Sequence, residues 1–146
     1  MFRHVVRSDV VDIEAPIGRA WDILTDFDRY SEWNPFTTRV DANLEVGATV
    51  KLHVVLGPFR LRQTARIDTI EPPTLLVWGV SMGAAWVLSA RREQRLERLD
   101  ESRCSYLTAD SFNGALTPLI VLLYGRAIRR GFNAMAVALS VRASGH

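Results

Sequence analysis

The sequence predicts a single small α+β domain, and three observations lead to this class. The chain has 146 residues, a length typical of one domain with one core, so we assign residues 1–146 to one unit. Residues 36–112 have the composition of consecutive short strands separated by turn signals. A long apolar and basic segment follows, and its spacing predicts a C-terminal helix.

Composition and charge narrow the class of protein. Hydrophobic residues make up 48% of the chain and charged residues 23%, as in ordinary globular proteins. The net charge of +2 is a small excess of 18 basic over 16 acidic residues, so we expect no nucleic-acid partner. Cys104 is the single cysteine, which excludes an intramolecular disulfide and a thiolate metal cluster. A chain with a single cysteine is best suited to the reducing cytoplasm.

No segment looks like a targeting or membrane element. Residues 1–7 lack the apolar core and cleavage site of a signal peptide, so we expect no secretion. The most apolar run, Leu119 to Tyr124, is much shorter than the roughly 20 residues of a spanning helix. We therefore expect no stable membrane insertion.

The first third of the chain predicts a strand and then helices. β-Branched residues between Val5 and Ile13 predict one strand, and Pro16 marks a helix start. That helix has one apolar stripe, formed by Ile17, Ala20, Trp21 and Leu24. Residues 26–35 mix aromatics with turn formers and predict a second, short helix or a turn.

The middle of the chain predicts an antiparallel meander. Turn signals lie at residues 45–47, 57–58, 71–73, 82–83 and 100–102. Parallel pairing would need crossover helices, and no helical stripe interrupts residues 36–112.

The C-terminal helix is expected from Thr117 to about Val141, with Pro118 in its first turn. Its first half is apolar almost all round, so we expect it to be covered on most sides. Its second half carries an apolar stripe of Ile128, Phe132, Met135 and Leu139.

Several stretches then resemble one superfamily. They are Val11–Pro16, Ala20–Phe27, Tyr30 with Glu32–Phe36, Ser111–Leu116, Arg130–Met135 and Ala138–Leu139. Together they resemble the START-like (Bet v 1-like, SRPBCC) superfamily, in its polyketide cyclase/dehydrase and lipid transport branch. The resemblance implies a helix-grip fold, with a curved antiparallel sheet around a long C-terminal helix and two short helices after the first strand.

The resemblance also implies a ligand cavity between the sheet and the C-terminal helix, with its entrance near residues 33–36 and Leu116. The strand of residues 75–82 is apolar on both faces, and it adds cavity candidates. The expected lining residues are Trp33, Phe36, Leu76, Trp78, Val80, Trp86, Phe112, Leu116 and Ile120.

Four polar residues are candidates for chemistry in that cavity: His53, Arg92, Tyr106 and Asp110. His53 alternates with apolar neighbours and could point inward or into water. Arg92 and Gln94 lie on an unusually polar strand face, and either could bind a carboxylate or carbonyl of a ligand. Members of the aromatase type use cavity tyrosines, threonines and acids, which implies such a role for Tyr106 and Asp110. We favour the alternative that Asp110 braces the following turn.

These features leave three functions open. The leading one is binding of a small hydrophobic molecule such as a lipid, polyketide or isoprenoid. The others are a cyclase/aromatase-like enzyme and a ligand-dependent regulatory protein. The dispersed histidines predict no metal site, no motif predicts a cofactor, and a homodimer is left open.

Overall fold

The computed structural model describes residues 2–145. The elements in chain order are β1 (Arg3–Arg7), β2 (Val11–Ile13), α1 (Ile17–Thr25), the 3-10 helix η1 (Phe27–Glu32), β3 (Thr37–Asp41), β4 (Thr49–Leu56), β5 (Phe59–Glu71), β6 (Leu75–Met82), β7 (Leu88–Arg98), β8 (Cys104–Asn113) and α2 (Thr117–Ser144). The predicted turns all fall between strands, and α2 extends three residues past its expected end at Val141.

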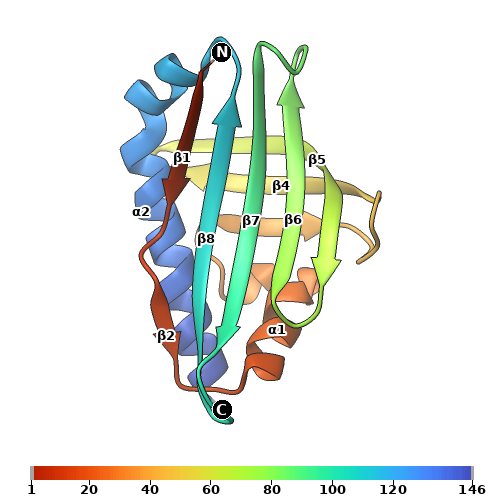
Figure 1. Ribbon diagram of the computed structural model, residues 1–146, viewed down its shortest axis with the longest axis vertical. Coiled ribbons are helices and arrows are strands. Elements are labelled where there is room, and N and C mark those ends of the chain that lie inside the picture. The colour runs from red at the N-terminus through yellow and green to blue at the C-terminus, as the bar shows by residue number, and fades with distance from the viewer. Residues whose placement is uncertain (1, 146) are drawn as a thin grey trace.

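All the strands join one antiparallel sheet. Its order is β1-β8-β7-β6-β5-β4-β3, and β2 pairs with β8 beyond the end of β1. From β3 to β8 each strand pairs with the next, so the predicted meander is confirmed. The helix α2 lies along one face of this sheet (Figure 1), which is the predicted helix-grip arrangement.

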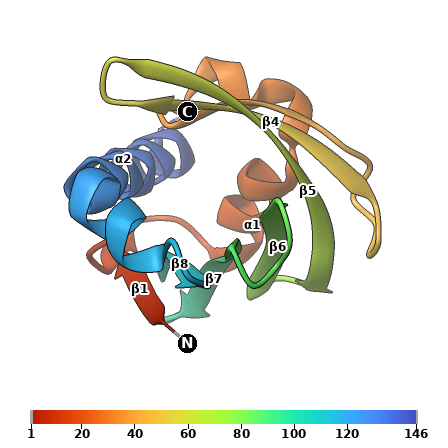
Figure 2. The same cartoon turned by 90° about the horizontal axis from the view of Figure 1, so that it is seen from above.

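The sheet bends strongly around α2. The pairing of β5 with β6 shifts register between Ile67 and Thr69, and that of β3 with β4 shifts between Thr37 and Arg39. Such irregularities bend a strand and increase its twist. As a result, β4 and β5 cross the molecule at a steep angle to β7 and β8 (Figure 2).

The prediction of a single strand from Val5 to Ile13 is wrong, because residues 8–10 separate β1 from β2. The Ser8 hydroxyl accepts a hydrogen bond from the Thr108 amide (3.1 Å), and the Ser8 amide donates to the Thr108 carbonyl (2.9 Å). A side chain thus replaces one ladder contact of the sheet, and the chain kinks away from β8 before β2 rejoins it.

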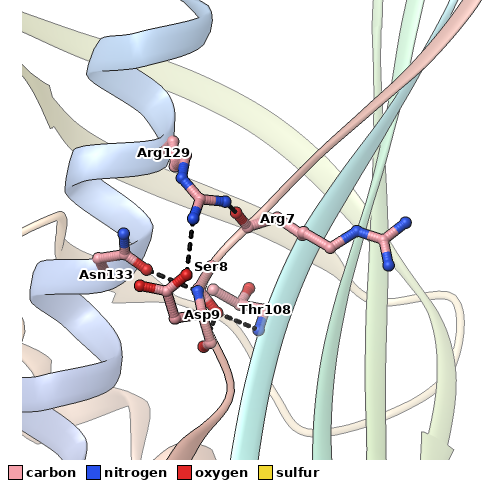
Figure 3. A network of polar contacts seen from close by, with 6 residues as sticks. All are labelled: Arg7, Ser8, Asp9, Thr108, Arg129 and Asn133. Atoms are coloured by element: carbon pink, nitrogen blue, oxygen red, sulfur yellow. Dashed lines mark hydrogen bonds and ion pairs between the residues drawn. The ribbon is translucent and has the colours of Figure 1, made fainter.

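The same break fastens α2 to the sheet (Figure 3). Arg129 donates to the Arg7 carbonyl (2.9 Å) and to the Asp9 carboxylate (2.6 Å), and the Asp9 amide donates to the Asn133 side chain (2.7 Å). These groups are exposed, so their contribution to stability is modest. They set the position of the middle of α2 along β1.

The two halves of α2 differ in burial. The expected stripe of Ile128, Phe132, Met135 and Leu139 is buried. The expectation that the first half is covered on most sides is wrong, because Leu119, Leu122 and Leu123 are exposed. The physical reason is that only one side of this half, with Ile120 and Tyr124, faces the cavity, and the leucines lie on its other sides.

The start of α2 is fixed next to the connection between β6 and β7. Gly114 has a φ of +119°, and a Cβ there would lie 2.6 Å from the Val87 carbonyl oxygen. The Ala115 amide donates to the Trp86 carbonyl and the Leu116 amide to that of Val87, each at 2.9 Å. Glycine is therefore required at this turn. Within residues 2–145, no helix has the length and hydropathy needed to cross a membrane.

Candidate functional site

A cavity of about 310 Å³ lies between the concave face of the sheet and α2. Its walls come from consecutive inward positions of β4 to β8, from Phe36, and from one face of α2. Alternation along the strands produces this arrangement, because every second side chain of a strand points to the same face. The wall is almost entirely apolar, and its polar side chains are Gln63, Arg92, Asp110 and the Tyr124 hydroxyl.

Five of the expected lining residues contribute to this wall. Phe36 precedes β3, Trp78 and Val80 point inward from β6, Phe112 from β8, and Ile120 from α2. They come from distant parts of the sequence, and the sheet and helix bring them together.

The other four expected lining residues lie outside the wall. Leu76 is fully buried in the core below the cavity, and Trp33 is half-buried against the Tyr30 ring. Trp86 and Leu116 are exposed, because they sit in the connections at the cavity end of the molecule rather than on inward positions.

Arg92 is the buried cation of the cavity wall. Its guanidinium donates to the hydroxyls of Thr108 (3.1 Å) and Thr37 (3.0 Å) and contacts the Met135 sulfur (2.8 Å). Its Cζ also lies 4.6 Å from the centre of the Phe132 ring. Aromatic faces stabilise a desolvated guanidinium. Among the described residues no carboxylate lies within 4 Å of it.

Asn34 positions two of these groups, and sequence reasoning missed it. Its buried side-chain oxygen accepts hydrogen bonds from the amides of Phe36 (3.0 Å) and Thr37 (2.9 Å). This local turn directs the Phe36 ring into the cavity and the Thr37 hydroxyl toward Arg92. The signal was the Asn-Pro pair at residues 34–35, which marks turns of this kind.

Asp110 faces the cavity from β8, directly across the strand pair from Arg92. Burial raises its pKa to about 6, and the charge of Arg92 opposes part of that rise. No side-chain hydrogen bond to Asp110 is present among residues 2–145, so the favoured interpretation that it braces the next turn lacks support. The residue is partly buried, and its carboxyl is an acceptor that faces the cavity.

Tyr106 lies on the same strand face but not in the cavity wall. Its hydroxyl donates to the Gln94 side-chain oxygen (2.6 Å), and both side chains are fully buried. Burial raises the pKa of Tyr106 to about 12, against a lowering influence of Arg92. Neither Tyr106 nor Gln94 can reach a molecule in the cavity without rearrangement of the core.

His53 faces away from the cavity. Its neighbours Leu52 and Val54 point inward from β4, so alternation places His53 on the outer face, where it lies beside Arg60 and Arg62. Within residues 2–145, no group of three His, Cys, Asp or Glu side chains is close enough to hold a metal ion.

The remaining wall residues also escaped the sequence analysis. They share inward positions on β4, β5, β6, β7 and α2. They are Leu52, Val54, Leu56, Phe59, Leu61, Gln63, Met82, Leu88, Ala90, Tyr124 and Ile128. Alternation in residues 50–56 and the four-residue spacing from Ile120 through Tyr124 to Ile128 were available signals.

Comparison with protein families now defines the class of the chain. The model of the family "Polyketide cyclase / dehydrase and lipid transport" matches residues 4–139. The chain belongs to this family. Its fold is that of the START-like, Bet v 1-like superfamily, as the resemblance implied. No curated protein matches the chain in sequence.

Solved structures share the fold at low sequence identity. Norcoclaurine synthase from Thalictrum flavum superimposes with a TM-score of 0.75 at 14% identity, over 99% of this chain and 96% of that one. The Zhui aromatase/cyclase from Streptomyces sp. R1128 superimposes with a TM-score of 0.68 at 21% identity, over 97% of this chain and 96% of that one. A START superfamily protein from Mycobacterium smegmatis superimposes with a TM-score of 0.74 at 15% identity, over 96% of this chain and 97% of that one. At these identities the comparison concerns the fold alone.

Proposed function

We propose that this protein binds a small hydrophobic molecule that carries one polar group, in the cavity between the sheet and α2. The supporting observation is a cavity with apolar walls which one partly buried carboxyl faces without a hydrogen-bond partner among residues 2–145. The volume of about 310 Å³ is at the small end of ligand pockets. Apolar burial would supply the affinity, and the polar group would set the orientation.

Arg92 and Asp110 suggest what the polar group is. A guanidinium has five N–H donors, and three of its contacts in this wall are already made. The remaining donors of Arg92 can bind a carbonyl oxygen, while the Asp110 carboxyl can accept from a hydroxyl. We therefore expect a ligand with a hydroxyl or carbonyl group on an apolar ring or chain.

A pair of small probes tests the proposal. We expect 2-naphthol to quench the tryptophan emission, because Trp78 lines the cavity. It should bind roughly tenfold more tightly than naphthalene, given the usual strength of a hydrogen bond to a charged group. Asp110→Asn should reduce that preference.

Two variants separate the cavity from the surface. Ala90→Phe fills the cavity from β7 and should abolish binding of 2-naphthol, whereas Val46→Phe places the same ring on an exposed loop and should not. Equal binding by both variants would contradict the proposal. Native mass spectrometry of the purified protein, followed by solvent extraction, would identify any ligand retained from the host.

One observation favours a second candidate, a cyclase-like enzyme. Asp110 has a pKa of about 6, so near neutral pH it can exchange a proton with a substrate carbonyl in the cavity. Tyr106 is outside the wall, so this candidate depends on Asp110 with Arg92 beside it. If the protein cyclises a poly-β-ketone substrate and Asp110→Asn abolishes this activity, the second candidate is supported. Unchanged turnover in that variant would contradict it.

A further inference from the structure

Six large apolar side chains are exposed on neighbouring segments at one end of the molecule, where they form an apolar surface. We call this surface the apolar rim, and it consists of Phe59, Trp86, Leu116, Leu119, Leu122 and Leu123. Leu122 is 82% exposed and Trp86 is 64% exposed. Scattered exposed leucines are ordinary, but a gathered set of this kind marks an interaction site.

Contacts between separate segments hold the rim together. The Phe59 ring lies 6.5 Å from the Tyr124 ring of α2, which joins the β4–β5 hairpin to the helix. The Trp86 carbonyl accepts from the Ala115 amide, which joins the β6–β7 connection to the start of α2. Phe59 and Tyr124 are also wall residues of the cavity. The rim therefore borders the cavity.

The rim continues into an arginine stripe on α2. Leu116, Leu119, Leu123, Arg126 and Arg130 follow one another at three- and four-residue spacings, so they share one helix face. All five are exposed, and this face lies next to the one that lines the cavity.

The stretches of chain that carry the rim contain basic but not acidic residues. The sequence has no Asp or Glu in residues 46–67, 72–92 or 111–146, the stretches that contain the rim. Four exposed arginines there, Arg60, Arg62, Arg126 and Arg130, have no acidic partner within 4 Å among residues 2–145.

Four acidic residues lie in segments at the other end of the molecule. Asp26 and Asp28 follow α1, and Asp100 and Glu101 lie in the turn between β7 and β8. In Figure 1 these segments lie at the end opposite to the β6–β7 connection and the start of α2. Asp26 and Asp100 pair there with Arg29 (3.3 Å) and Arg103 (3.1 Å), whereas the four arginines near the rim have no such partner among residues 2–145.

We propose that the apolar rim docks this protein on the surface of a membrane that contains anionic phospholipid. Leucine and aromatic side chains of the rim enter the boundary between headgroups and acyl chains, and the arginines contact lipid phosphates. A second copy fits this surface poorly, because two arginine-rich, acid-free faces would repel each other. A nucleic acid would leave the leucines without a role. The docked orientation places the cavity next to the bilayer, whatever its ligand.

Vesicle binding tests the proposal directly. The full chain should co-sediment with vesicles of phosphatidylcholine and phosphatidylserine, bind poorly to phosphatidylcholine alone, and dissociate as salt is raised. The emission of Trp86 should shift to shorter wavelength on binding, and Trp86→Phe should remove most of that shift.

Matched variants assign the effect to the rim. Leu119→Gln/Leu123→Gln should weaken vesicle binding by more than about tenfold, because the apolar burial of two leucines is lost. Arg126→Gln/Arg130→Gln should weaken it by about 25-fold, since each arginine near an anionic surface contributes about fivefold. Val137→Gln/Val141→Gln changes two exposed residues of the same helix beyond the arginines and should bind like the original chain.

Three outcomes would overturn the proposal. One is absence of binding to anionic vesicles by a folded chain. Another is an equal loss of binding in the leucine, arginine and valine variants. The third is a dimer that the leucine substitutions dissociate, without vesicle binding, which would assign the rim to self-association. These measurements require no cavity ligand, so they are independent of the proposed function.

Discussion

Arg92 and Asp110 are neighbours across β7 and β8, yet their polar groups are satisfied to different degrees. The guanidinium of Arg92 has protein partners and aromatic faces around it. The carboxyl of Asp110 faces the cavity and has none among residues 2–145. A buried carboxyl without a partner destabilises a fold. Retaining one in the cavity wall fits a role in ligand binding.

The titration of Asp110 leads to a pH-dependent prediction. Its folded-state pKa of about 6 lies above its ordinary value of 3.8, so between these values the folded chain binds more protons than the unfolded chain. The free energy of unfolding therefore falls as pH rises through this window. Asp110→Asn should be more stable by up to about 3 kcal/mol near neutral pH, with the difference vanishing below about pH 3.

Urea unfolding at a series of pH values measures this difference. Glu101→Gln, which changes an exposed carboxyl in the β7–β8 turn, is the control and should show little effect. A stability difference for Asp110→Asn that does not change with pH would show that its carboxyl is not buried as described.

Tyr106 gives a second prediction at the level of single residues. Its hydroxyl donates to Gln94, whose side-chain nitrogen already lacks a partner. Tyr106→Phe would leave the whole buried amide unpaired and should cost about 1–3 kcal/mol of stability. Tyr124→Phe removes a hydroxyl that makes no hydrogen bond with the described residues, and should change stability by less than about 0.5 kcal/mol. Denaturant unfolding gives the free energy of unfolding of both variants. An equal loss of stability in the two would contradict the Tyr106–Gln94 hydrogen bond.

Among the elements, α2 combines two tasks in one helix. Its C-terminal half packs on the sheet through Phe132, Met135 and Leu139, which are fully buried. Its N-terminal half covers the cavity with one face and exposes the leucines of the apolar rim on another. Packing of the C-terminal half can therefore hold the helix in place while the N-terminal half remains available for binding.

Alanine substitutions at two glycines of α2 test how closely the helix approaches the cavity wall. A Cβ on Gly131 would lie 2.1 Å from a ring carbon of Phe36, whereas a Cβ on Gly125 meets only a Val121 methyl at 3.4 Å. Gly131→Ala should destabilise the protein by about 1–3 kcal/mol and displace Phe36 from the cavity. Gly125→Ala should be neutral or stabilising by up to about 1 kcal/mol, as expected in a helix interior.

Thermal unfolding and 2-naphthol titration measure both effects. The Gly131 variant should lose stability and probe binding together, and the Gly125 variant should keep both. If Gly131→Ala were stabilising, the close contact between α2 and Phe36 would be wrong.

At the scale of the whole molecule, curvature of the sheet creates the cavity. The outer strands cross over α2 at an angle to the central ones (Figure 2), so the inward side chains of β4 and β5 face those of β7 and β8 across a gap. An apolar cavity of this size forgoes packing contacts that a filled core would have. A bound molecule would restore them.

Ligand binding should consequently stabilise the whole fold. At a 2-naphthol concentration about 100 times its Kd, the free energy of unfolding should rise by about 2.7 kcal/mol, because the ligand binds the folded state only. Differential scanning fluorimetry would show this as a higher Tm. Ala90→Phe should not respond to 2-naphthol, and an equal shift in that variant would place the binding site elsewhere.

Much of the architecture was accessible from local patterns. Turn signals at residues 57–58 and 82–83, alternation in the strands and the stripe of α2 specify which segments form elements and which faces are apolar. The break at Ser8 was missed because it depends on a hydrogen bond to Thr108, which is 100 residues away.

The candidate site was predictable only in part. Phe36, Trp78 and Phe112 are inward residues of recognisable elements, whereas Trp86 and Leu116 are apolar residues that the connections leave exposed. A sequence pattern shows that a side chain is apolar, but it does not show whether a cavity, the core or solvent lies beyond it.

The sequence by itself determined the family, the order of the elements and the antiparallel meander, because these depend on periodicity and on short-range turn chemistry. The tertiary structure alone decided that Arg92 and Asp110 face the cavity, that His53 does not, and that the leucines of α2 remain uncovered. The reason is that these properties depend on the curvature and register of the sheet, which bring together residues from both ends of the chain.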